Sequence, residues 1–172
     1  MNAAYRLFVH AAEAKDVDAL TRIIRSHKEL HHYVGDDGSL LDVIGYNCPE
    51  LFEASFEAGL HPDSGPQEPS QTFLQHVAAE SDVELVRLAL RYGAVVERRN
   101  CAGETALGYA ASWGSLEVVR ALVEAGVDVN AVEGKHEGQL STALDSAFRR
   151  PEIRRYLVEH GAKSFAELHP PD

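Results

Sequence analysis

The sequence predicts an all-α fold of helix-pair repeats that stack on one another, and three observations lead to this prediction. Equivalent apolar positions recur every 33 residues, at Ala11, Ile44, Val77 and Ala110. A serine or threonine precedes the apolar segment in copies two to five, at Ser39, Thr72, Thr105 and Thr142. A glycine closes the same copies, at Gly59, Gly93, Gly126 and Gly161. A fixed period of this length is typical of repeat proteins, whose units pack against their neighbours.

Each unit contains two short helical patterns, which are clearest in the fourth copy. Thr105 can accept hydrogen bonds from backbone N–H groups at a helix start, and residues 106–112 form a short apolar segment with small side chains. A tight turn at residues 113–115 leads to a second helix, whose buried face is expected to carry Val118, Val119, Leu122 and Val123. Gly126 can adopt the left-handed conformation that commonly ends a helix. One such pair cannot bury its own apolar face, so neighbouring units have to stack.

We expect one repeat domain over residues 1–172 with five units. The predicted boundaries are 1–34 for an N-terminal capping repeat, 35–66, 67–99, 100–132, and 133–172 for a C-terminal capping repeat with its tail. Pro49 and Pro151 each stand where they can open the second helix of a unit. The last residues predict a short capping helix followed by a frayed tail.

The residues of the fourth copy carry a resemblance to a known family. With the 33-residue period and the segment GETALGYAASWGSLEVVRALVEAGVDVN at 103–130, the sequence resembles the ankyrin repeat. The resemblance covers nearly the whole chain and implies antiparallel helix pairs, short hairpin-like finger loops on one side and no sheet core. The C-terminal cap resembles those of stand-alone bacterial members, so we expect a stand-alone bacterial protein of five repeats.

The sequence departs from the family pattern at the helix starts. No proline follows the serine or threonine in any copy. The family has a histidine three residues after the serine or threonine. In this sequence that position is occupied by Asp42, Gln75, Gly108 and Asp145. These replacements weaken the usual buried polar network, so we expect looser helix starts.

Composition and charge exclude several classes of function. The formal net charge of −11 argues against nucleic acid and anionic membranes as partners, because both require a basic face. The first residues do not resemble a signal peptide, and we expect a cytoplasmic protein that is monomeric when free. Two cysteines, Cys48 and Cys101, form neither a disulfide framework nor a metal site, and we expect both to be small, buried residues.

The acidic residues are unevenly distributed along the chain. Residues 29–86 contain twelve Asp and Glu but no Lys or Arg. One interpretation is a solvated surface that keeps the protein soluble. The other is a negative field that steers a cationic partner to this region. The sequence leaves both interpretations open.

We expect neither catalysis nor a bound metal or cofactor. The nine histidines include His27 and His31, four residues apart, but their spacing lacks the zinc-protease pattern, and His27 stands where a helix is expected to end. His10, His76 and Tyr109 share one repeat position and could line up along the stacked first helices, either as core or groove-lining residues or in a proton-active role. Stacked repeats present an open groove, whereas catalysis needs a cavity that excludes water.

The resemblance implies a partner surface made of finger tips and the exposed ends of the first helices. Mapped onto this sequence, the candidate partner-binding residues are Asp36, Asp37, Tyr46, Asn47, Glu68, His76, Glu80, Glu104, Tyr109, Ser112, Trp113, His136 and Arg149. Trp113 is the only tryptophan, and exposed aromatic residues are enriched at interface hot spots. The alternative is that Trp113 folds back over a neighbouring helix turn and covers apolar surface.

These observations predict a non-enzymatic protein–protein interaction module with an acidic concave groove for a protein partner with a basic surface. By analogy, such a module could be an inhibitor or immunity protein that neutralises a cationic effector or toxin. The alternative is an assembly, chaperone-like or regulatory subunit that holds a partner enzyme without blocking its site.

Overall fold

The computed structural model describes residues 3–32, 40–44, 48–64, 71–134 and 140–170 of the 172-residue chain. The chain forms two compact units, and each is described by itself. Unit 1 comprises Met1–Gln67 and Arg91–Ala94, and unit 2 comprises Glu68–Leu90 and Val95–Asp172.

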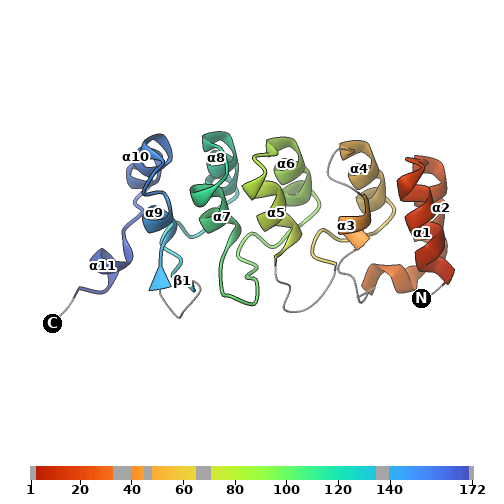
Figure 1. Cartoon of the computed structure of the whole chain (residues 1–172), viewed down its shortest axis with the longest axis horizontal. Helices are drawn as coiled ribbons and strands as arrows, with labels where there is room; N and C mark the ends of the chain where they lie inside the picture. The colour runs from red at the N-terminus through yellow and green to blue at the C-terminus, as the bar shows by residue number, and fades with distance from the viewer. Residues whose placement is uncertain (1–2, 33–39, 45–47, 65–70, 135–139, 171–172) are drawn as a thin grey trace. The chain divides into compact units, whose positions relative to one another are not determined.

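Unit 1 consists of short helices arranged in pairs (Figure 1). They are α1 (Ala3–Glu13), α2 (Val17–Ser26), the 3-10 helix η1 (Lys28–His32), α3 (Leu40–Ile44) and α4 (Pro49–Glu57). Helix α1 packs against α2 and α3, and α2 packs against α4. Fully buried Phe8, Leu20 and Phe52 fill the space between these helices. The apolar faces expected from the repeat pattern therefore meet one another, as stacking requires.

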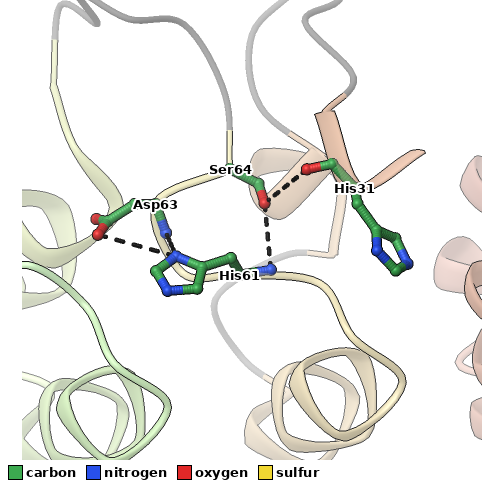
Figure 2. Close-up of polar contacts among 4 residues, drawn as sticks. All are labelled: His31, His61, Asp63 and Ser64. Carbon is green, nitrogen blue, oxygen red and sulfur yellow. Dashed lines mark hydrogen bonds and ion pairs between the residues drawn. The ribbon is translucent and has the colours of Figure 1, made fainter. Parts of the chain in front are cut away.

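The turn after α4 is tied to η1 by a small polar network, shown in Figure 2. The Ser64 hydroxyl donates to the carbonyl oxygen of His31 at 3.1 Å and accepts from the backbone N–H of His61 at 3.2 Å. The backbone N–H of Asp63 donates to Nδ1 of His61 at 3.1 Å. Ser64 and His31 are 33 residues apart, so this contact joins equivalent parts of successive repeats.

Unit 2 is also built of short helices arranged in pairs (Figure 1). Its elements are α5 (Phe73–Ala79), α6 (Val83–Arg91), α7 (Ala106–Ser112), α8 (Leu116–Glu124), β1 (Glu133–Gly134), β2 (Leu140–Ser141), α9 (Ala143–Ser146), α10 (Pro151–Glu159) and α11 (Phe165–Leu168). Helix α7 packs against α5 on one side, α9 on the other and its own partner α8. The two strands pair antiparallel and form a hairpin-like finger beside α9, with no sheet core within the described ranges. The predicted all-α fold of stacked helix pairs is confirmed.

The helix starts of unit 2 are better held than the sequence suggested. Gln75 accepts from the backbone N–H of Thr72 at 2.8 Å, while the Thr72 hydroxyl accepts from the N–H of Gln75 at 3.1 Å. Asp145 accepts from both the N–H and the hydroxyl of Thr142. The expectation of looser helix starts is wrong for these copies, because Gln and Asp build reciprocal caps in place of the family's histidine.

Gly126, Pro49 and Pro151 stand at the helix ends and helix starts that the sequence predicts for them. Gly126 has a φ of +86° just beyond α8, and prolines occupy the first turn of α4 and α10. The expected capping helix is α11, which begins with the reciprocal pair Ser164 and Glu167. The expectation for the cysteines is half wrong, because Cys48 is buried whereas Cys101 lies exposed on a finger. In the described part of the chain, no helix is both long and apolar enough to cross a bilayer.

Candidate functional site

A groove of about 520 Å³ lies over one face of α7 in unit 2. One end is formed by finger residues Glu104 and Glu133. Gly108, Tyr109, Ser112 and Trp113 of α7 and its C-terminus line the middle, and Ser146, Phe148, Arg149 and Arg150 line the other end. The groove therefore combines exposed aromatic rings with carboxylates at one end and guanidinium groups at the other.

Helix α7 supplies the aromatic part of the groove. Tyr109, Ser112 and Trp113 follow the i, i+3, i+4 spacing that places side chains on one helix face. The rings of Tyr109 and Trp113 lie 5.4 Å apart at an interplanar angle of 53°, and Trp113 is 62% exposed. Trp113 thus packs on Tyr109, one helix turn earlier, while most of its surface stays in solvent, so its partner-binding role and the alternative of covering apolar surface both stay predictions.

The turn between α9 and α10 forms the basic end. Phe148 is 68% exposed, and the Arg149 guanidinium lies 5.0 Å from the centre of its ring, in a cation–π arrangement. The guanidinium of Arg150 donates to the carbonyl oxygens of Ser112, at 3.3 Å, and Gly114. Arg150 therefore ties this turn to the end of α7 and holds the groove walls together.

Glu133 forms the floor of the acidic end. Although it is a glutamate, it is only 3% exposed. Its Oε1 accepts from the backbone N–H of Thr105, at 3.1 Å, and from the Thr105 hydroxyl. Its carboxylate lies against Gly108, where any side chain would collide with it. Burial raises the pKa of Glu133 above its ordinary value of 4.5, opposed by the hydrogen bonds from Thr105 and the charge of Arg99.

Glu104 stands beside Glu133 on the rim. Its Oε2 accepts from Asn100 Nδ2 at 2.8 Å and from the Tyr109 hydroxyl at 3.1 Å. Burial and the neighbouring Glu104 carboxylate raise the pKa of Tyr109 to about 12. Tyr109 is therefore a neutral donor at physiological pH, and it fixes the Glu104 carboxylate in place.

The structure brings together only part of the set expected from the sequence. Glu104, Tyr109, Ser112, Trp113 and Arg149 meet in the groove. Two further candidates lie outside the groove lining. His76 lies on α5, with its Nδ1 3.3 Å from Gln71 Oε1, and Glu80 lies exposed at the end of α5. The remaining candidates lie outside the described residues: Asp36, Asp37, Tyr46, Asn47, Glu68 and His136. A partner-binding role for any of these residues stays a prediction.

Sequence reasoning missed two important groove residues. Phe148 gave no repeat signal, because the fifth copy is shortened at this turn; its place before two arginines was the available clue. Glu133 lies 28 residues from the threonine it caps, and its only signal was the missing side chain at Gly108. A helix start that lacks the family's histidine could have prompted a search for a polar substitute elsewhere in the sequence.

Comparison with known proteins establishes the family. A family model described as ankyrin repeats, in three copies, matches residues 40–133 and, in a second overlapping match, residues 76–167. The chain belongs to the ankyrin repeat family. It also resembles the E3 ubiquitin-protein ligase Ufd4 of Drosophila melanogaster, with 38% identity over 84 residues. This match covers 47% of the chain but 3% of the ligase, so the chain spans a small part of that protein's length.

Membership in the ankyrin repeat family defines the general function. Ankyrin repeats are protein–protein interaction modules of a generally non-enzymatic fold, and they bind protein partners. Among the described residues, His, Cys, Asp and Glu side chains form no group of three or more that could hold a metal ion. The feature of unit 2 that bears on partner binding is the surface chemistry of the groove.

Proposed function

We propose that the chain binds its protein partner through the α7 groove, with Trp113 and Phe148 as the apolar anchors. The supporting observation is the exposure of these two rings, 62% and 68%, beside one groove. Large aromatic side chains left in solvent are the residues that gain most from burial at an interface. Because Arg150 and the packing of α7 hold the walls, the groove can bind with little reordering.

The charge of the chain supports a partner with a basic surface. The net charge is −11, and residues 29–86 contain no Lys or Arg. A negative field of this kind accelerates encounter with a cationic protein and is screened by salt. Binding should therefore weaken as ionic strength rises. Neutralising Asp36, Asp37 and Glu68 together should slow association; an unchanged association rate would contradict steering by this segment.

The experiment that tests the groove compares matched truncations of exposed apolar residues. Trp113→Ala and Phe148→Ala each remove a groove ring, whereas Val158→Ala removes an apolar side chain on α10 that is 54% exposed and outside the groove lining. Partner captured by the full chain should be lost with either groove variant, by about tenfold or more in affinity, and retained with the control. Equal capture by all three variants would place the interface elsewhere.

The consequence of binding separates the two functions that the sequence left open. An inhibitor or immunity protein blocks its partner, a cationic effector or toxin, so partner activity should fall when the complex forms. An assembly, chaperone-like or regulatory subunit leaves that activity intact. We favour the inhibitor because a chain of net charge −11 suits the covering of a cationic site, and retained activity in a purified complex would overturn this choice.

A further inference from the structure

We propose that the acidic end of the α7 groove binds a lysine or arginine side chain of the protein partner. This inference rests on the proposed function, because it names the chemistry of the partner at the same groove. Two carboxylates line the groove there, Glu104 from the rim and the buried Glu133 from the floor. A cationic side chain can pair with both.

One oxygen of each carboxylate accepts no hydrogen bond from the residues that the structure describes. Within the described part of the chain, the bonds to Glu133 fall on Oε1 and those to Glu104 fall on Oε2. The Glu133 carboxylate lies directly over Gly108, which has no side chain to cover it. A donor entering the groove across Gly108 therefore meets carboxylate oxygens that are already oriented.

Burial makes Glu133 suited to recognising charge. A carboxylate withdrawn from water is costly unless it is paired and hydrogen-bonded, and here the bonds from Thr105 and the nearby charge of Arg99 compensate it only in part. A cation from the partner would complete the pairing in a site shielded from solvent. Charge-assisted bonds of this kind are stronger than those at an exposed surface.

The aromatic walls fit the same occupant. A lysine stem or an arginine plane passing along the groove would lie against Tyr109 and Trp113, whose rings are 5.4 Å apart. Cations are attracted to the faces of such rings. Both aliphatic stems also bury apolar surface while their charged ends reach the carboxylates.

The basic residues at the opposite end give the groove a direction. Arg150 donates to backbone carbonyls, and Arg149 lies over the Phe148 ring. These guanidinium groups repel a second cation at that end. A basic side chain is therefore placed at the Glu104–Glu133 end, which sets the orientation of the bound segment.

Fluorescence of the only tryptophan provides the test, because Trp113 lines the groove. The probes are acetyl-Ala-Arg-Ala-amide and the same peptide with citrulline, which is neutral but nearly the same shape. The arginine peptide should change Trp113 fluorescence saturably and bind about tenfold more tightly than the citrulline peptide. Equal affinity, or no saturable change with the arginine peptide up to about 10 mM, would overturn the proposal.

Matched variants locate the effect. Glu133→Gln and Glu104→Gln should each reduce the arginine preference about fivefold or more, whereas Glu117→Gln, on the exposed surface of α8, should leave it within about twofold. A melting curve checks that each variant folds. If Glu133→Gln fails to fold, the arginine preference of Glu104→Gln alone tests the proposal. An equal loss with Glu117→Gln would assign the effect to the general field and overturn the site.

The natural partner separates the two proposals. If Trp113→Ala loses the partner while Glu133→Gln and Glu104→Gln keep it, the groove binds the partner, but the proposal of a basic side chain at its acidic end is wrong. If Trp113→Ala and Phe148→Ala both keep it, the proposed function itself fails.

Discussion

Gly108→Ala should destabilise the protein, although alanine is normally the better helix residue. At a helix position, replacing glycine with alanine ordinarily stabilises by about 0.5–1 kcal/mol. Here the added Cβ would lie 2.6 Å from Cδ of Glu133 and closer still to its oxygens, so the buried carboxylate has to move. Movement removes the acceptor for the backbone N–H and hydroxyl of Thr105, a residue that is 0% exposed.

The two effects can be compared directly. Leaving buried donors without acceptors costs about 1–3 kcal/mol. After the helix gain is subtracted, the expected net loss is about 1–2 kcal/mol of unfolding free energy. For a chain of this size, that corresponds to a fall in melting temperature of about 3–6 °C. Thermal unfolding followed by circular dichroism measures this shift.

The control is the same substitution in a Glu133→Ala background. Without the carboxylate, the Cβ of residue 108 meets no obstacle from this side chain, and Gly108→Ala should stabilise. The double-mutant cycle should therefore show a coupling of about 2 kcal/mol between the two positions. A stabilising Gly108→Ala in the wild-type background, or the same effect in both backgrounds, would show that the Glu133 carboxylate does not oppose a side chain at position 108.

Three further predictions concern stability. Burial keeps Glu133 protonated in the folded state at a pH where the unfolded chain, with the ordinary pKa of 4.5, has ionised. The contribution of Glu133 to the free energy of unfolding should therefore be full below pH 4.5 and be lost as pH rises through its folded-state pKa. Glu133→Gln should flatten the plot of unfolding free energy against pH in that range. An unchanged slope in the variant would contradict this prediction. Gly114→Ala would place a Cβ 2.5 Å from the carbonyl oxygen of Ala78 and should cost about 2 kcal/mol or more in denaturant melts. Gly126→Ala, where only the φ of +86° opposes a side chain, should cost about 1 kcal/mol, and a larger loss than at Gly114 would show that close packing is not the dominant constraint.

The local features of the fold could be predicted because their causes lie within a few residues. The apolar segment predicted at residues 106–112 is α7 itself, with Thr105 at its start. Gly126 ends α8 with the expected left-handed backbone, and prolines open α4 and α10. Each of these signals acts through backbone geometry or a hydrogen bond across a single helix turn, so neighbouring residues suffice to reveal it.

The groove could be predicted only in part. Trp113 stood out as the only tryptophan, at the exposed end of a first helix, and Tyr109 stood out because it shares a repeat position with His10 and His76. The structure exposes the Trp113 ring and packs it on Tyr109. Phe148 and Glu133 did not stand out. Both belong to the fifth copy, where a longer finger and a shorter turn break the register on which the sequence argument depended.

The repeating unit, its caps and turns, and the acidic character of the chain all follow from the order of residues along the chain. The substitute for the missing histidine at the start of α7 depends on the three-dimensional fold: it is a glutamate 28 residues away, buried against Gly108. The fold also lets Arg150 donate to the carbonyl oxygens of Ser112 and Gly114, 38 and 36 residues earlier, which ties one wall of the groove to the end of α7. Such contacts depend on how one repeat stacks on the next, and stacking is set by the packing of whole faces and not by the spacing of residues along the chain.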